Sequence, residues 1–261
     1  MCEQCGCSLT HERMQLSDDK GIVSSTPADP HAIAVITNIL RENDELAAHN
    51  RSHLGAHGVL AINLMSSPGS GKTSLIESTI DAIGGRLRIA VIEGDIETEN
   101  DAARVRAKGV PAVQITTGQT CHLDAHMVHQ ALHRLDLHAV DLLFIENVGN
   151  LVCPASFDLG QHANVTLLSV TEGDDKPVKY PAMFRISDLV LLAKCDLLPV
   201  LDDFDPDKAR AHVRALANPA PILEVSARRP ESLLRWIAWL EERRASLGEL
   251  SSRNPHAMPP G

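Results

Sequence analysis

The sequence predicts an α/β fold: a doubly wound, mostly parallel sheet with helices on both faces. Strand-like apolar runs recur along the chain, near residues 59–65, 87–93, 110–116, 140–146, 164–171, 188–194 and 221–225. Helical patterns lie between them, near residues 73–83, 99–108, 122–136 and 205–217. This alternation is typical of parallel strands joined by crossover helices. With 261 residues, 44% of them hydrophobic, the chain can bury a sizeable core.

The two ends of the chain depart from this pattern. Asp29 and Pro30 form a good helix start, and apolar residues follow at helical spacing to about residue 53. Pro230 opens a last helix, and a proline-rich stretch begins at Asn254. We therefore predict three parts: a flexible Cys-rich metal motif and linker at 1–28, an α/β domain with a leading helix at 29–250, and a disordered tail at 251–261.

Charge and composition exclude several classes of protein. A formal net charge of -10 argues against a general electrostatic grip on nucleic acid or anionic lipid. The chain starts without the basic and apolar regions of a secretory signal, and no apolar run approaches a membrane span. We therefore expect a cytoplasmic protein with no membrane span. The 6 cysteines are few for a disulfide scaffold, whereas clustered cysteines in a reducing compartment bind metal or carry out redox chemistry.

A phosphate-binding loop follows the first strand of the domain. Residues 66–73 read Ser-Ser-Pro-Gly-Ser-Gly-Lys-Thr and lead directly into a helical run. Glycines let backbone N–H groups surround phosphate oxygens, while Lys72 reaches the β and γ phosphates and Thr73 can bind Mg²⁺. Ser66 replaces the first glycine of the usual motif, but the strand and helix around it are the required context. The predicted nucleotide-binding residues here are Pro68, Gly69, Ser70, Gly71, Lys72, Thr73 and Ser74.

A P-loop hydrolase also needs an acid that acts through Mg²⁺ or on the attacking water. Glu146 ends a buried strand and opens Glu-Asn-Val-Gly, and Asp95 closes Glu-Gly-Asp after another strand. An acid at a strand end is more often a solvated turn residue or a helix cap, but these two lie at the predicted phosphate edge. We assign Lys72, Asp95 and Glu146 as catalytic, and Thr73, Asp95 and Glu146 as ligands of Mg²⁺.

Two further segments are expected to contact the base. Residues 193–196 read Ala-Lys-Cys-Asp, where nucleotide-binding GTPases carry Asn-Lys-x-Asp. Asp196 would pair with the guanine ring and the stem of Lys194 would lie along it, while Ser226 and Ala227 would lie on its other side. Because Ala193 replaces the Asn, selectivity for GTP would depend on Asp196.

Two Cys/His groups are candidates for metal binding. Cys2, Cys5 and Cys7 can converge on one soft or borderline ion, with half of a zinc site and a redox pair as the rival interpretations. These residues do not decide which metal is bound, although removal of Met1 would let the Cys2 amine complete an N/S square plane, which favours Ni²⁺.

The second group comprises Cys121, His122 and Cys153, which follow strands that end at the phosphate edge. Its rival interpretation is that both cysteines are small buried hydrophobes. Cys153 lies 4 residues beyond Gly149, so movement of that loop on hydrolysis would disturb a metal ligand. Other histidines recur at helical spacing and could chelate a metal, but we expect solvated helix faces for His49, His53, His57, His126, His129 and His133.

Taken together, these motifs closely resemble the HypB family of nickel-incorporation GTPases, P-loop proteins of NiFe-hydrogenase maturation. Its marks are the N-terminal Cys-x-x-Cys-Gly-Cys and the segments at 66–73, 93–96, 121–125, 146–154 and 173–181. The resemblance implies a tight nickel site at Cys2, Cys5 and Cys7. It also implies a weaker nickel or zinc site at Cys121, His122 and Cys153, near the interface of a GTP-dependent homodimer.

The same resemblance implies GTP hydrolysis to GDP and nickel transfer to a small zinc-containing chaperone, and from there to the hydrogenase large subunit. The sequence departs from the family at Ala193 and in lacking the polyhistidine tract of some relatives. Two alternatives remain: the related GTPase that matures urease, and a nickel storage protein whose nucleotide site has decayed through Ser66 and Ala193.

Overall fold

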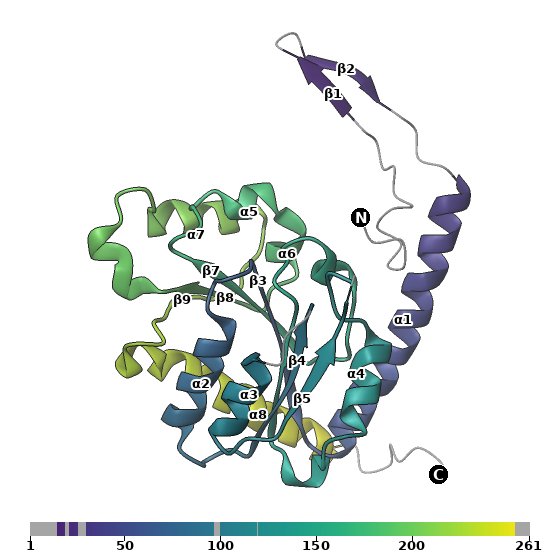
Figure 1. Cartoon of the computed structure of the whole chain (residues 1–261), viewed down its shortest axis with the longest axis vertical. Helices are drawn as coiled ribbons and strands as arrows, with labels where there is room; N and C mark the ends of the chain where they lie inside the picture. Colours follow the sequence, from purple (N-terminus) through teal and green to yellow (C-terminus); the bar gives the residue numbers. More distant parts are fainter. Residues whose placement is uncertain (1–14, 19–20, 26–29, 97–99, 119, 254–261) are drawn as a thin grey trace.

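A computed structural model describes residues 15–18, 21–25, 30–96, 100–118 and 120–253. Its centre is a seven-stranded sheet in the order β5-β4-β6-β3-β7-β8-β9, in which every neighbouring pair is parallel (Figure 1). The strands are β3 Leu60–Ser66, β4 Ile89–Asp95, β5 Ala112–Thr116, β6 Leu142–Glu146, β7 Ala163–Ser169, β8 Leu189–Ala193 and β9 Ile222–Glu224. Each corresponds to one of the apolar runs, so the predicted parallel sheet is confirmed.

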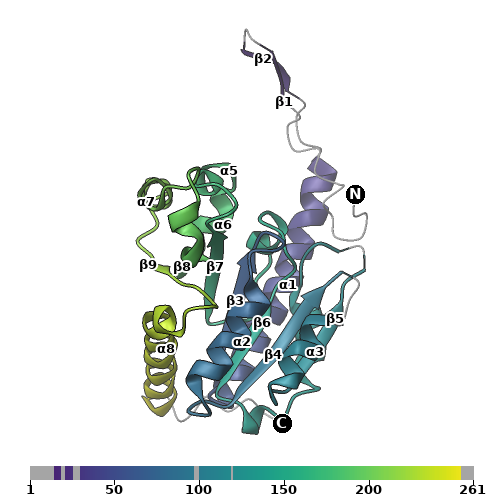
Figure 2. The ribbon, with the colours of Figure 1, turned by 60° about the vertical axis from the view of Figure 1, so that its left-hand side comes forward.

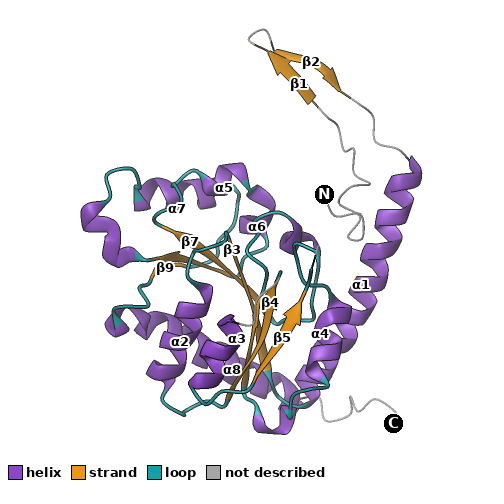
Figure 3. Ribbon diagram, viewed as in Figure 1, coloured by secondary structure: helices purple, strands orange, loops and turns teal. Residues whose placement is uncertain are grey.

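Helices cover both faces of this sheet (Figures 2 and 3). They are α1 Pro30–Ala56, α2 Lys72–Ile83, α3 Asn100–Ala107, α4 Ala125–Leu132, α5 Lys176–Lys179, α6 Pro181–Arg185, α7 Pro206–Ala215 and α8 Leu234–Arg253. One face packs against α2, α3 and α8, and the other against α1, α4, α6 and α7. The fold is therefore doubly wound, as the alternation predicted.

The two faces follow from the alternation of side chains along each strand. In β3, Leu60, Ile62 and Leu64 pack toward α2 and α8, whereas Ala61 and Met65 face the opposite layer. The buried Trp236 of α8 fills the first layer and donates its indole N–H to Thr79 Oγ1 at 3.0 Å. Aliphatic packing on both faces holds β3, and with it the loop that follows, in the middle of the sheet.

The structure adds elements that the sequence did not predict. The segment expected to be only a linker contains two antiparallel strands, β1 Gln15–Asp18 and β2 Gly21–Ser25. Helices α5 and α6 are shorter than two turns and carry a proline in the first turn, so no periodicity reveals them. Helix α8 continues to Arg253, past the boundary placed at residue 250. Within the described residues, no helix is both long and apolar enough to cross a membrane.

Gly160 is a strict requirement for the packing of α1. Its φ is +90°, and a Cβ atom there would lie 2.5 Å from Asn50 Cβ and 2.6 Å from the Ala47 carbonyl oxygen. We expect Gly160→Ala to lower the free energy of unfolding by about 2–4 kcal/mol, because strain and overpacking add. Urea denaturation measures this change. Gly55→Ala, also in α1 but with no atom within 4 Å, is the control and should change stability by less than about 1 kcal/mol; equal effects would contradict the prediction.

Candidate functional site

The phosphate-binding loop joins β3 to the start of α2, as predicted. Gly69 and Gly71 have φ values of +72° and +100°, which residues with a side chain rarely adopt. Lys72 is buried and donates from Nζ to Ser66 Oγ at 3.1 Å, and Ser70 Oγ also donates to Ser66 Oγ. Ser66 therefore does not disrupt the loop where it replaces a glycine. Its hydroxyl group holds Lys72 inside the loop.

A cluster of acids lies beside this loop. Carboxylate oxygens of Glu93, Asp101 and Glu146 all lie within 4.8 Å of one another. Glu93 and Glu146 are paired in register on the adjacent strands β4 and β6, and Thr73 Oγ1 donates to Glu146 Oε1 at 2.8 Å. Within the described part of the chain, Oε2 of Glu93 and Oε2 of Glu146 are buried without a hydrogen-bond partner. Such hard oxygen donors fit the coordination chemistry of Mg²⁺.

Burial shifts the protonation of two of these acids. It raises the pKa of Glu93 to about 8, and the neighbouring charge of Glu146 acts in the same direction. Burial likewise raises the pKa of Glu146 to about 7, although Lys72 and the Thr73 hydroxyl group oppose the shift. A cation at this position would therefore replace protons that the two carboxyl groups otherwise retain.

The sequence analysis named Glu146 but missed Glu93 and Asp101. Glu93 lies inside a buried strand, and Asp101 lies on α3, where Arg104 bonds it at 2.7 Å. Asp95, which we assigned to the magnesium site, is half-buried and accepts the Ile96 N–H at 2.7 Å. It is not in the carboxylate cluster found among the described residues, so its catalytic role stays a prediction.

The predicted base-binding segments line one cleft of about 500 Å³ beside the phosphate loop. Its walls include Ala193, Lys194, Asp196, Ser226, Ala227 and Arg228, together with Ser70, Gly71 and Ser74. Asp196 Oδ1 accepts from Ser226 Oγ at 2.6 Å, and this bond lowers the pKa of Asp196. Lys194 Nζ donates to the Gly69 carbonyl oxygen at 2.7 Å. The predicted base-binding segment at 193–196 is therefore hydrogen-bonded directly to the phosphate loop.

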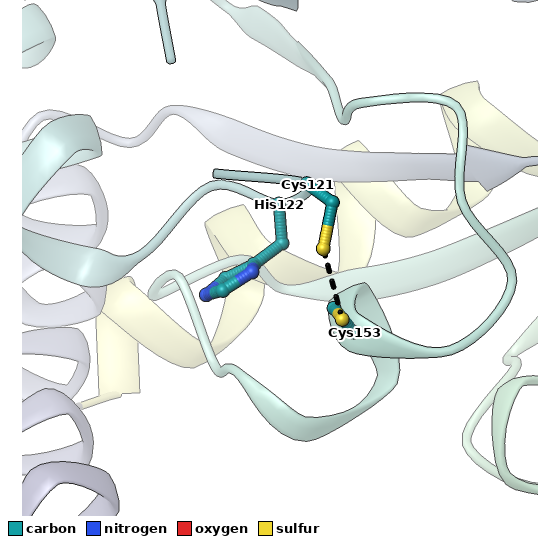
Figure 4. Close-up of side chains that lie close together, drawn as sticks. All are labelled: Cys121, His122 and Cys153. Carbon is teal, nitrogen blue, oxygen red and sulfur yellow. Dashed lines mark hydrogen bonds between the residues drawn. The ribbon is translucent and has the colours of Figure 1, made fainter. Parts of the chain in front are cut away.

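The predicted internal metal residues also come together, as Figure 4 shows. One ligand atom each from Cys121, His122 and Cys153 lies within 4.8 Å of the others, and the two sulfur atoms are 3.0 Å apart. His122 is buried and stacks on Phe157 with ring centroids 4.0 Å apart. Its Nδ1 has no hydrogen-bond partner among the residues described, and burial lowers its pKa, which favours the neutral, ligating form. Two thiols and an imidazole are typical ligands of a borderline metal ion. Metal binding therefore explains this group better than hydrophobic packing of the cysteines.

A single segment connects this group to the nucleotide site. Gly149 packs on Pro68 so closely that a Cβ atom would lie 2.8 Å from the Pro68 Cα. Asn147 Oδ1 accepts from the backbone N–H of Leu123, the residue after His122, at 3.1 Å. Residues 146–153 therefore contact the phosphate loop at one end and contain a candidate metal ligand at the other. Cys2, Cys5 and Cys7 lie outside the described residues.

Comparisons with known proteins agree with this geometry. The family model for the CobW/HypB/UreG nucleotide-binding domain matches residues 60–224. The hydrogenase maturation factor HypB of Azotobacter vinelandii is 54% identical over 228 residues, covering 84% of this chain and 75% of that protein. The crystal structure of HypB from Helicobacter pylori in complex with nickel has a TM-score of 0.76 at 42% identity, covering 78% of this chain and 96% of that one. For HypB from Archaeoglobus fulgidus the TM-score is 0.73 at 41% identity, covering 78% and 99%.

The raised pKa values predict how stability depends on pH in the absence of nucleotide and metal. Between about pH 5 and pH 8 the folded chain retains protons on Glu93 and Glu146 that the unfolded chain has lost. The free energy of unfolding should therefore fall as the pH rises through this window. Glu93→Gln should make the fall shallower by up to about 1.4 kcal/mol per pH unit in urea denaturation with EDTA. Glu231→Gln, at an exposed position, is the control; an unchanged slope in Glu93→Gln would contradict the assignment.

Proposed function

The chain belongs to the HypB family of hydrogenase maturation factors, and from this membership we propose that it is a GTP-hydrolysing nickel metallochaperone. It would bind nickel as cargo and deliver it, in a nucleotide-dependent way, during maturation of NiFe hydrogenase. The observation that carries the proposal is the segment 146–153, because it joins a carboxylate beside the phosphate loop to a thiolate of the candidate metal group.

The proposed hydrolysis divides among residues around the phosphate loop. Lys72 and the loop N–H groups would neutralise the β and γ phosphates, while Thr73 and Glu146 would hold Mg²⁺, assisted by Glu93 or Asp95. When bound, Mg²⁺ stabilises charge on the transferred phosphoryl group. Asp196, held by Ser226, accepts hydrogen bonds from guanine, and the Lys194 stem lies along the base.

Nickel would be held by two groups. Cys121, His122 and Cys153 would form the nucleotide-coupled site, which could also take zinc. From the sequence motif alone, Cys2, Cys5 and Cys7 would form the tight one. A nucleotide can move nickel only if it binds two conformations of the metal site with different affinity. A γ-phosphate and its Mg²⁺ bound beside Glu146 would shift segment 146–153 and so change the position of Cys153.

The proposed partners follow from family membership. They are a second copy of this chain bound in a GTP-dependent way, a small zinc-containing nickel chaperone, and, through it, the hydrogenase large subunit, all in the cytoplasm. The exposed Val152, with 59% of its surface accessible beside Cys153, supports a protein contact near the metal site. The relative from Azotobacter vinelandii is a hydrogenase maturation factor, which does not favour the urease-type alternative. The bond from Lys72 to Ser66 argues against a decayed nucleotide site.

The hydrolysis proposal is tested with Lys72→Ala. Steady-state GTP turnover should fall by about 100-fold or more, because a preorganised charge on the phosphates is lost. Lys208→Ala, an exposed lysine on α7, is the matched control and should retain turnover. If neither protein differs from the unaltered chain, or if the unaltered chain shows no turnover, storage without hydrolysis becomes the better interpretation.

The switch is tested by nickel affinity with GDP and with a non-hydrolysable GTP analogue, after Cys2, Cys5 and Cys7 are replaced by serine. We expect the two affinities to differ, and Cys121→Ala to weaken binding at least about tenfold, since loss of even a supporting partner has that effect. Cys195→Ala is the control, because its thiol bonds the Leu192 carbonyl oxygen away from the metal group. Equal affinities with both nucleotides would leave two independent sites and reject the switch.

A further inference from the structure

Helices α1 and α4 bring histidines from two distant segments into one cluster. His49 and His53 of α1 lie next to His129 of α4 and His133 at its end, with ring centroids 5.4 Å and 6.1 Å apart. We call these four residues the histidine array. Figure 1 shows the two helices side by side. The expectation of solvated helix faces holds for the exposed His49, His126 and His133, whereas His53, His57 and His129 are only half-exposed.

Asn50 determines which nitrogen of His129 is available. Its Nδ2 donates to the carbonyl oxygens of Ala125 and Leu159, at 2.9 Å and 3.1 Å. Its Oδ1 is consequently an acceptor, and the atom bonded to it at 3.0 Å is His129 Nδ1. The proton of neutral His129 is therefore on Nδ1, and Nε2 carries a lone pair. Metal-binding histidines are commonly oriented in this way, by a bond from the other ring nitrogen to an oxygen.

The lone pair of His129 faces a second imidazole. His133 Nε2 lies 3.1 Å from His129 Nε2. Two nitrogens bound to one ion at about 2.0–2.1 Å, in tetrahedral or octahedral geometry, lie about 2.9–3.4 Å apart. Without a metal, His133 donates its Nε2 hydrogen to His129. If His133 takes its other neutral tautomer, with the proton on Nδ1, a cation can replace that hydrogen.

The surroundings also favour a cation. The pairs His49 with His129 and His53 with His133 show that α1 and α4 run in the same direction, so both carboxyl ends approach the array. The carboxyl end of a helix carries partial negative charge, which stabilises a nearby cation. The array lies at the opposite end of α4 from Cys121 and His122, and α4 is about 12 Å long.

We propose that the histidine array is a separate site for a borderline divalent cation such as Ni²⁺ or Zn²⁺, bound through Nε2 of His129 and His133. His49 and His53 supply further imidazoles once their side chains rotate toward the ion. Because its ligands are imidazoles alone, the site prefers borderline ions over soft Cu(I). This site goes beyond the proposed function and does not depend on it.

The test uses the full chain with all 6 cysteines (Cys2, Cys5, Cys7, Cys121, Cys153 and Cys195) replaced by serine, so that thiolates contribute nothing. Equilibrium dialysis with Ni²⁺ should show saturable binding, and X-ray absorption should show nitrogen and oxygen neighbours without sulfur. Adding His133→Gln should weaken binding at least about tenfold. This residue is exposed, so the fold should persist, which circular dichroism checks. His126→Gln is the matched control on α4, because His126 Nε2 bonds Gln130 instead of the array.

Two results would overturn the proposal: no saturable Ni²⁺ binding in the thiolate-free chain, or equal binding with and without His133→Gln. Failure here is distinguishable from failure of the proposed function. The switch is measured in the chain in which only Cys2, Cys5 and Cys7 are replaced by serine. In that chain, His133→Gln should leave the difference in nickel affinity between GDP and the GTP analogue unchanged. If that chain shows no such difference even with His133 present, the nucleotide switch is rejected and the proposal for the histidine array is unaffected.

Discussion

The close packing of Gly149 on Pro68 is the contact on which the arrangement of the whole site depends. A Cβ atom at position 149 would lie 2.8 Å from one backbone atom of Pro68 and 2.9 Å from another, so only glycine permits this approach. The contact holds the segment after β6 against the phosphate loop, while β6 itself lies between β3 and β4. Glu146 thereby reaches Thr73, and Cys153 reaches Cys121. Two kinds of chemistry share one edge of the sheet because one short segment serves both.

Two buried carboxyl groups at this edge of the sheet raise the free energy of the folded chain. Glu93 and Glu146 are almost fully buried, and each has an oxygen without a hydrogen-bond partner among the described residues. Isolated carboxylates in such a place are destabilising unless they are protonated or paired with a cation. The strands tolerate the acids because aliphatic packing on both faces fixes the sheet. A cation bound between these carboxylates would therefore remove this destabilisation of the folded chain. This favours binding of nucleotide and metal together.

Most of the fold could be predicted from the sequence because long apolar runs and the phosphate loop are local signals. The grouping of Cys121, His122 and Cys153 was also predictable, since each follows a strand that ends at the same edge. Glu93 and Asp101 were not predictable. Their proximity to Glu146 depends on strand register and on how α3 packs, and the local sequence predicts neither of these. The histidine array was missed for a similar reason, because only the pairing of α1 with α4 brings its two halves together.

The two groups of metal-binding side chains differ in a way that bears on nickel handling. Thiolates bind borderline and soft ions strongly, whereas imidazoles alone bind borderline ions more weakly and lose them on protonation. The hydrogen bond between Leu123 and Asn147 connects the group of Cys121, His122 and Cys153 to segment 146–153. The histidine array is instead oriented by Asn50 of α1, outside that segment. Metal on the array would therefore respond to concentration and pH, and metal on the thiolates would respond to nucleotide. Because His129 lies on α4 and His122 precedes this helix, the two proposed sites would lie near opposite ends of α4, and only the site at Cys121, His122 and Cys153 would respond to nucleotide.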